Sequence, residues 1–185
     1  MTYRSVLLAA AALFASVPAQ AAHWNVDYAK SKLGFSVMWS NEPFSAAFRS
    51  WRADIDFDPE ALWQAHASVS IDLASETSDE ADFDDGLKGA QGFQTSQFPQ
   101  AIFVTRSFER RQGNSYLATG DLTIKGVTRP ITLPFTLTFS GNSVHMKGSA
   151  QVVRTDYGVG LGIWTAPSPV AHDVTVTIDL TATRS

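Results

Sequence analysis

The chain has 185 residues, with 14 Lys and Arg against 18 Asp and Glu, and a formal net charge of −4 at pH 7. A mildly acidic protein of this kind is a poor candidate for binding nucleic acid or an anionic membrane surface. It contains no cysteine, which excludes disulfides, thiolate chemistry, zinc–sulfur sites and the acylated cysteine of a bacterial lipoprotein.

The first segment predicts an export signal. Arg4 precedes an apolar run, Val6 to Ala15, that is too short to span a membrane comfortably, and Ala19-Gln20-Ala21 has the small-x-small pattern that signal peptidase cleaves. We therefore predict a signal peptide over residues 1–21, cleaved after Ala21, and one domain over residues 22–185; an uncleaved helical anchor is the alternative. Loss of Arg4 leaves 13 Lys and Arg against 18 Asp and Glu, a net charge of −5. An exported domain without disulfides suits a periplasm, so we expect a soluble periplasmic protein with no membrane anchor.

Alternation of apolar with polar residues predicts strand after strand in the mature chain. Turn residues separate these segments at the spacing typical of β-sandwiches and β-barrels. The predicted strands are Trp24–Val26, Leu33–Trp39, Phe44–Phe57, Val69–Leu73, Ala101–Phe108, Ser115–Lys125, Ile131–Phe139, Val144–Arg154 and Val174–Thr183.

The regular alternation is interrupted in two places. Between Phe48 and Trp51 the apolar phase shifts, which predicts a β-bulge inside one bent strand. The segment from Ser75 to Gln97 is acidic at first and then predicts a short helix, with Leu87 and Phe93 as its apolar anchors.

The acidic run from Glu76 to Asp85 does not fit a calcium loop. An EF-hand needs oxygen ligands at alternate positions, Gly at the sixth and Glu at the twelfth. With Gly86 as the sixth residue, the first would be Ala81 and the twelfth Gly92. We therefore expect a solvated acidic loop.

The clearest hairpin spans Gly120 to Phe139. Gly126 permits a tight bend between its two strands, and Pro130 stiffens the exit. The apolar face of this hairpin must be covered by the rest of the chain. A sandwich would fill its interior with side chains, whereas a closed barrel of about eight strands can hold one small ligand. Periodicity alone does not choose between them.

Three motifs give the chain a resemblance to a known family. They are LTIKGVTRP at residues 122–130, the aromatic and proline run at Phe93, Phe98, Pro99 and Phe103, and the group Arg154, Asp156, Tyr157 and Gly158. With these motifs the chain resembles the YceI-like family over Trp24 to Thr183. The resemblance implies an all-β fold, an extended antiparallel eight-stranded lipocalin-like barrel with a short helical segment between strands. It also implies an interior that holds a long apolar chain, typically a polyisoprenoid.

Two positions depart from the pattern of this family. Trp39 stands where many relatives carry a histidine, and Phe83 stands where many carry an arginine. Both changes replace a polar group by an aromatic one. If the polar groups meet a ligand head group in relatives, the choice of head group differs here.

The inward-facing residues of the predicted strands are the main candidates for ligand binding. The alternative is that they pack against one another and leave no void, because protein interiors are normally close-packed; the family resemblance favours a lined cavity. Each methylene removed from water contributes about 0.8 kcal/mol, so a chain of a few isoprene units could bind without hydrogen bonds. The candidate lining residues are Leu33, Phe35, Val37, Trp39, Trp51, Ile55, Phe57, Ile131, Leu133, Phe135, Leu137 and Phe139.

Two arginines are candidates for contacting a pyrophosphate or quinone head group, since a guanidinium suits phosphate by its bidentate geometry. They are Arg129 and Arg154. The alternative for Arg129 is a solvated turn residue. The alternative for Arg154 is a structural pair with Asp156 or another carboxylate.

Other chemistries lack their motifs. His23, His66, His145 and His172 lie far apart in the sequence, and a zinc site needs several converging ligands. No HExxH, GxSxG or P-loop motif occurs. The glycines at 158, 160 and 162 are not followed by a predicted helix, so they indicate a rim loop rather than a dinucleotide site. We expect no metal, no cofactor and no catalytic residue.

These expectations combine into one function, the non-catalytic binding and carrying of a long apolar lipid of polyisoprenoid or isoprenoid quinone type inside the barrel. The alternative is a structural or interaction module without lipid, a partner of a membrane redox protein. An enzyme acting on the lipid would need an acid–base pair on the apolar face, whereas Arg52 and Asp54 fall on the opposite phase from Trp51. Exposed barrel rims are compatible with a homodimer.

Overall fold

The computed structural model describes residues 21–78 and 80–185, so the predicted leader and its cleavage site lie almost entirely outside the described residues. The described chain forms one sheet of eleven strands in the order β4-β5-β7-β8-β9-β10-β11-β2-β3-β6, with β1 paired to β11. The strands are β1 Trp24–Val26, β2 Lys32–Trp39, β3 Glu42–Phe48, β4 Trp51–Asp56, β5 His66–Asp72, β6 Glu76–Thr77, β7 Gln100–Arg110, β8 Ser115–Ile124, β9 Val127–Ser140, β10 Ser143–Val153 and β11 Val170–Arg184. The helices are η1 Tyr28–Lys30, η2 Leu62–Gln64, η3 Leu73–Ser75, α1 Ala81–Lys88 and η4 Arg154–Tyr157.

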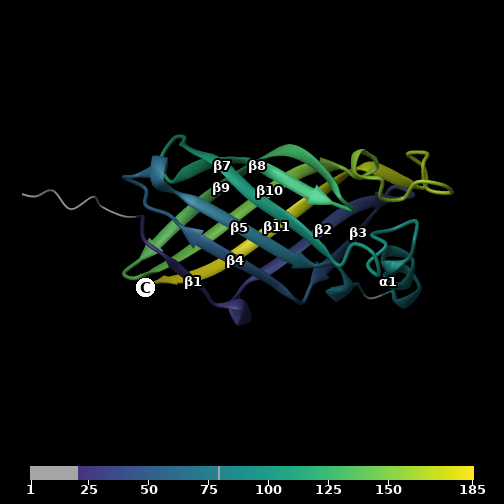
Figure 1. Cartoon of the computed structure of the whole chain (residues 1–185), viewed down its shortest axis with the longest axis horizontal. Coiled ribbons are helices and arrows are strands. Elements are labelled where there is room, and N and C mark those ends of the chain that lie inside the picture. Colours follow the sequence, from purple (N-terminus) through teal and green to yellow (C-terminus); the bar gives the residue numbers. More distant parts are fainter. Residues whose placement is uncertain (1–20, 79) are drawn as a thin grey trace, which may run out of the picture.

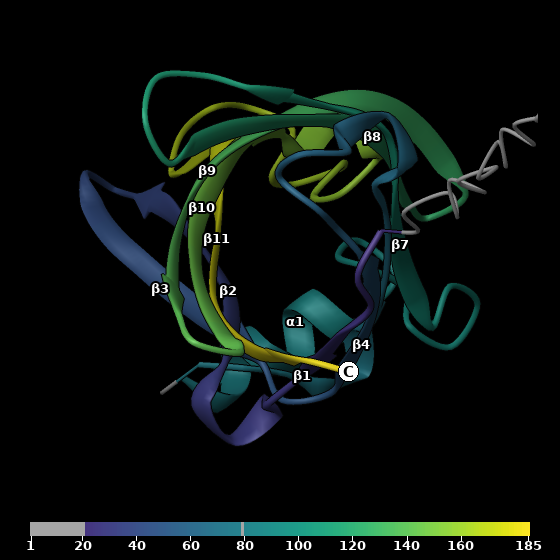
Figure 2. The ribbon, with the colours of Figure 1, turned by 90° about the vertical axis from the view of Figure 1, so that its left-hand side faces the viewer.

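The sheet curls into a barrel because β3 and β4 follow each other in the chain but pair with different neighbours. β3 pairs with β2, whereas β4 pairs with β5. Only Arg49 and Ser50 separate them, so the chain itself joins the two sides of the curled sheet (Figure 2). A single bridge between His23 and Asp56 brings the N-terminal segment against β4 at the far end of that seam.

Two sequence predictions about the strands are therefore corrected. The phase shift between Phe48 and Trp51 is not a bulge within one strand: the strand ends and its successor takes a new partner, which requires the side chains to change phase. The sheet has eleven strands rather than eight. If β3 and β4 are counted once, and the short β1 and β6 are set aside, eight long strands remain, so the lipocalin-like all-β architecture is confirmed.

The predicted central hairpin is present with a tighter turn than expected. Lys125 and Gly126 both have positive φ angles, of 50° and 73°. Two such residues match the twist of the flanking strands, β8 and β9. Ile124 consequently pairs with Val127, and β9 begins four residues before the predicted Ile131.

One end of the barrel is closed by α1, which confirms the predicted short helix (Figure 1). Leu87 packs against the core and Phe93, just after the helix, is buried, as expected for its two anchors. The opposite end holds Tyr116, whose ring stacks on Phe135 at 5.5 Å, with Phe57 edge-on at 5.4 Å. Side chains therefore fill part of the interior at this second end. Within the described residues, none of the helices has the length and apolar character needed to cross a bilayer.

Candidate functional site: an apolar cavity in two chambers

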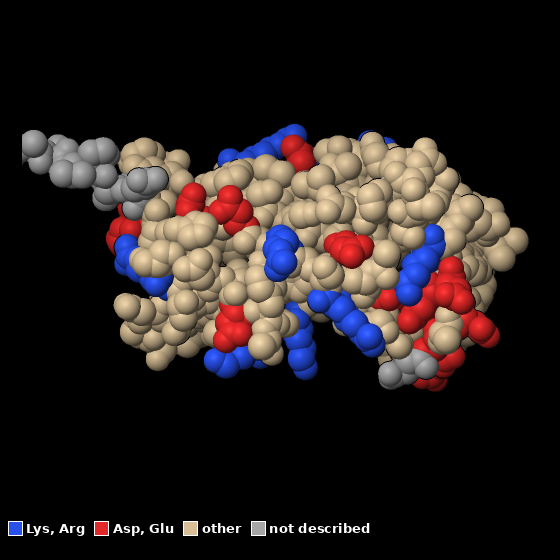
Figure 3. Space-filling model, turned by 60° about the horizontal axis from the view of Figure 1, so that its bottom comes forward, with Lys and Arg blue, Asp and Glu red and all other residues tan. Residues whose placement is uncertain are grey.

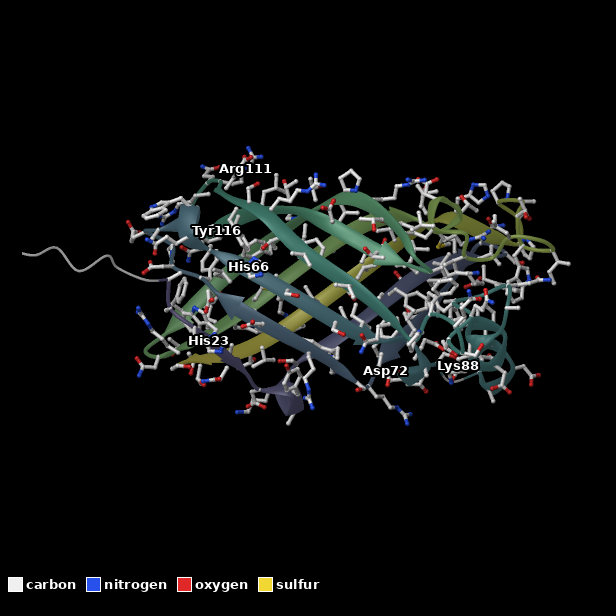
Figure 4. All side chains as sticks on the ribbon, viewed as in Figure 1. His23, His66, Asp72, Lys88, Arg111 and Tyr116 are labelled. Carbon is white, nitrogen blue, oxygen red and sulfur yellow. The ribbon has the colours of Figure 1, made fainter. Side chains whose placement is uncertain are left out.

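The barrel encloses two apolar chambers that lie along its length. The larger has a volume of about 180 Å³ and the smaller about 90 Å³. The larger chamber lies toward the end with α1, where Figure 4 labels Lys88, and the smaller lies toward the end with Tyr116 and His23. Their walls are almost entirely hydrocarbon because the inward phase of every long strand is apolar.

The two chambers meet at a waist. Four residues line both of them: Val69, Phe103, Leu133 and Ile178. The ring of Phe103 is held there by close packing on Gly120, where an added Cβ would lie 2.7 Å from Phe103 Cε2. A chain that occupied both chambers would have to pass this ring.

Most of the predicted lining residues lie on these walls. Trp51 is the exception: it is buried but lines neither chamber, and its ring packs edge-on against Tyr28 at 4.9 Å. Leu133 contributes to both chambers. The larger chamber contains Leu33, Phe35, Val37, Trp39 and Ile131 of the predicted set, and the smaller contains Ile55, Phe57, Phe135, Leu137 and Phe139.

Several lining residues outside the strands were not predicted as lining from the sequence. Phe83 and Leu87 come from α1, and Gly160 and Trp164 come from the loop after η4. None of these positions belongs to an alternating pattern, so only the packing of helix and loop over the barrel end identifies them. The further lining residues on strands, such as Val152, carry the same alternation as those predicted.

Aromatic rings form the wall next to α1. Trp39 lies edge-on to Phe83 with ring centroids 4.7 Å apart, and Phe44 stacks on the same ring at 4.0 Å. Trp39 and Phe83 are the two positions at which the sequence predicted a departure from the family pattern. The structure brings them into direct contact, so this corner of the cavity is aromatic rather than polar.

Arg154 lies in the wall of the larger chamber but makes no pair with a carboxylate in the described chain, contrary to the alternative raised from the sequence. It is 7% exposed, and its guanidinium donates to backbone carbonyls. Nε donates to Ala171 O at 2.9 Å and Nη2 to Val170 O at 2.9 Å. Nη1 donates to Val159 O and Gly160 O at 3.1 and 3.2 Å. Burial lowers the pKa of Arg154, but a guanidinium stays protonated in proteins.

The second arginine candidate is elsewhere. Arg129 is exposed at the start of β9 and lines neither chamber. Burial raises the pKa of Tyr157, and the charge of Arg129 is close enough to oppose that rise. Tyr157 does line the larger chamber. The structure therefore gives the two arginines different surroundings: Arg154 is buried in the chamber wall, and Arg129 is exposed outside it.

Glu76 corrects the prediction of a fully solvated acidic loop. It is 1% exposed, and neither of its carboxyl oxygens has a hydrogen-bond partner among the described residues. Glu76 pairs directly with Phe48 across β6 and β3, so both side chains project to the interior face. Burial raises the pKa of Glu76 to about 7, nearby Asp84 adds to the effect, and Lys88 opposes it. The burial of Glu76 could not be predicted from local sequence, because β3 and β6 are far apart in the chain.

The fold also gathers polar groups on the outer surface that are remote in sequence. His23 Nδ1 lies 2.9 Å from Asp56 Oδ1 and 3.7 Å from Asp54 Oδ1, and these atoms are close enough to hold a metal ion. His23 has no ligand-spaced partner in the sequence, because its bridge to Asp56 of β4 is a long-range contact. All three side chains are at least partly exposed.

The chamber walls offer little for acid–base chemistry. Among the described lining residues none is a carboxylate or a histidine, and the polar ones are Arg154, Tyr157 and Thr105. The Thr105 hydroxyl is occupied by the backbone of Ala67, at 2.8 Å to its nitrogen and 3.1 Å to its oxygen. The geometry is that of a binding cavity, because ligand sites are mostly apolar with few fixed polar groups.

Comparison with known proteins relates the chain to a family. A family model described as the YceI-like domain matches residues 24–182. The chain is 26% identical over 166 residues to a UPF0312 protein of Shewanella denitrificans, covering 86% of this chain and 84% of the relative.

Solved structures share the fold. The chain is similar to BcnA of Burkholderia cenocepacia, with a TM-score of 0.83 and 34% identity, covering 86% of this chain and all of that one. It is also similar to a polyisoprenoid binding domain from Saccharophagus degradans, described as implicated in plant cell wall breakdown. There the TM-score is 0.70 at 17% identity, covering 90% of this chain and all of the other, so this second likeness concerns the fold.

Proposed function

The chain belongs to the YceI-like family, and we propose that it binds one long apolar lipid, of polyisoprenoid or isoprenoid quinone type, along the axis of its barrel. The observation that carries the proposal is the pair of hydrocarbon-lined chambers that share the waist at Phe103. An apolar cavity of about 150 Å³ in another protein stays dry and binds benzene, so a cavity of about 180 Å³ is large enough for apolar cargo.

Binding would depend on burial. Each buried methylene contributes about 0.8 kcal/mol, and the walls provide no array of free donors that would recognise a polar chain. Selectivity would follow from the length and width of the cavity. The protein would act without catalysis and without any cofactor other than the lipid, as a carrier or buffer in the periplasm, where the predicted leader would deliver it.

The head group would lie at the aromatic corner formed by Trp39 and Phe83. The N–H groups of Arg154 are directed at backbone carbonyls of the loop after η4 and of β11, so its charge acts on the ligand only through space. Arg129 is exposed and would meet a phosphate only outside the chambers. A neutral or planar head group therefore fits this wall better than a pyrophosphate.

The test is uptake of a defined chain by delipidated, refolded protein. We expect stoichiometric recovery of a polyprenol from a detergent-dispersed lipid mixture, detected by mass spectrometry after gentle extraction. Leu133→Trp should abolish uptake, because it fills the waist. Thr132→Trp is the matched control, because its side chain is exposed on the outer face of the same strand. Absence of any bound chain in the unmodified protein would favour an interaction module with a filled barrel.

A further inference from the structure

The loop between η4 and β11 carries the most exposed aliphatic side chains at the α1 end. We call residues 158–169 the rim loop. Ile163 is 75% exposed and Leu161 is 46% exposed. The twelve residues of the rim loop include no Lys, Arg, Asp, Glu or His, whereas α1 beside it is acidic, as the red side chains at that end in Figure 3 indicate.

The exposure of Ile163 is built into the fold. Arg154 donates to the carbonyls of Val159, Gly160 and Trp164, which spans the loop on both sides of Ile163. The Gly162 nitrogen also donates to Thr165 Oγ1 at 2.7 Å. These bonds fix the backbone of the rim loop and keep its aliphatic tip, Leu161 and Ile163, exposed. A loop without them could fold these side chains against the barrel.

The same loop forms part of the cavity wall. Gly160 and Trp164 line the larger chamber, while Leu161 and Ile163, which alternate with them, are exposed. The external apolar tip and the internal apolar wall are therefore continuous through one short segment. A lipid that left the chamber at this end would move along this segment.

The chemistry of the rim loop fits a bilayer better than a protein partner. Protein interfaces are anchored by Trp, Tyr and Arg, but the exposed tip offers only Leu161 and Ile163. Backbone carbonyls that enter a bilayer need partners, and several carbonyls of this loop already accept from Arg154. The acidic residues of α1, including Asp82 and Asp84, would repel an anionic surface.

We propose that the rim loop docks the α1 end of the barrel on a phospholipid bilayer of low net charge, with Leu161 and Ile163 inserted among the lipids. This docking rests on the proposed lipid-binding function, which supplies the cargo. The bilayer is then the surface from which the lipid is taken or to which it is delivered. Transient contact is expected, because two aliphatic side chains give only weak, reversible attachment.

Site-specific labelling tests the docking. The chain has no cysteine, so Ile163→Cys and Trp63→Cys can each carry one environment-sensitive fluorophore. Trp63 is the matched control, because it is 82% exposed on η2 at the opposite end of the barrel. With phosphatidylcholine vesicles we expect a blue shift for the label at 163 and none at 63. The variant Leu161→Ser/Ile163→Ser should lose at least about tenfold in vesicle flotation, and Trp63→Ser should not.

Three results would overturn the proposal: no vesicle association of the unmodified protein, an equal response at position 63, or binding that grows as phosphatidylglycerol is added. Uptake of polyprenol from detergent is measured in parallel, since it does not require docking. Normal uptake without docking would reject only the rim-loop proposal. Docking without uptake would reject the lipid-binding function instead.

Discussion

Trp39 of β2 and Phe83 of α1 lie edge to face across the end of the larger chamber, with ring centroids 4.7 Å apart and an interplanar angle of 70°. Such tilted pairs contribute about 0.5–1.5 kcal/mol beyond the burial of their area. The contact attaches α1 to the barrel wall. The helix α1 therefore covers the cavity, and its attachment to the barrel depends on this aromatic pair.

Truncation of that ring should speed ligand exchange. We expect Phe83→Ala to raise the release rate of a bound polyprenol by about tenfold, equivalent to about 1.4 kcal/mol of lost contact. Stopped-flow transfer to acceptor vesicles measures this rate. Phe44→Ala is the comparison, because Phe44 stacks on Phe83 at 4.0 Å but does not line the chamber, so it loosens α1 without removing part of the wall. A release rate in both variants equal to that of the unmodified protein would show that α1 does not control exchange.

Opening the waist should change the preferred chain length. In Phe103→Ala the two chambers should merge, so affinity should shift toward longer polyprenols in a competition assay read by mass spectrometry. Loss of this buried ring should also lower the free energy of unfolding by about 3–5 kcal/mol. Phe108→Ala removes a ring that lines only the smaller chamber. If both variants retain the original length preference, the chambers do not act as one site.

Removal of Arg154 should destabilise the loop that follows it. Arg154→Ala would leave several buried carbonyls without a donor, and we expect a loss of about 3 kcal/mol or more in urea unfolding. Arg154→Lys should recover only part of this, since an ammonium has three donors and no planar fork. Arg129→Ala, at an exposed position, should change stability by less than about 0.5 kcal/mol. A mild effect of Arg154→Ala would contradict the structural role given to its guanidinium.

Glu76 should make the protein less stable as the pH rises. Its pKa is about 7 in the folded chain against an ordinary value of 4.5, so between these values the folded state binds the extra proton. The folded state is then favoured at low pH, and stability falls as the pH rises from about 4.5 to 7, by an amount on the order of 3 kcal/mol. Above pH 7 the full loss is present.

Urea unfolding of Glu76→Gln checks that slope. The free energy of unfolding of the variant, relative to that of the parent protein, should be higher at pH 8 than at pH 4.5. The reason is that the amide does not ionise. Glu42→Gln, at an exposed position on β3, serves as the control and should leave the pH dependence as it is. A parent protein and Glu76→Gln with parallel pH profiles would mean that Glu76 ionises normally in the fold.

The strands and most of the cavity lining followed from local sequence, whereas the choice of a barrel over a sandwich came from the family resemblance. Leu33, Phe35 and Val37 alternate with residues of the outer face, and the pleat of a strand sends alternate side chains to opposite sides whatever the strand pairs with. The helix between β6 and β7, α1, could likewise be predicted, because the two-residue alternation of apolar and polar residues stops there. The turn at Gly126 was visible because few residues adopt a positive φ angle.

The tertiary structure alone decided which polar and aromatic groups meet inside. Glu76 is buried because β6 pairs with β3, Arg154 is enclosed because the rim loop folds back over it, and Trp39 meets Phe83 because α1 covers the barrel end. The sequence by itself determined the two faces of each strand, since that depends on the geometry of neighbouring residues. Contacts between segments far apart in the chain depend on how the sheet closes, and alternation within one strand carries no information about that closure.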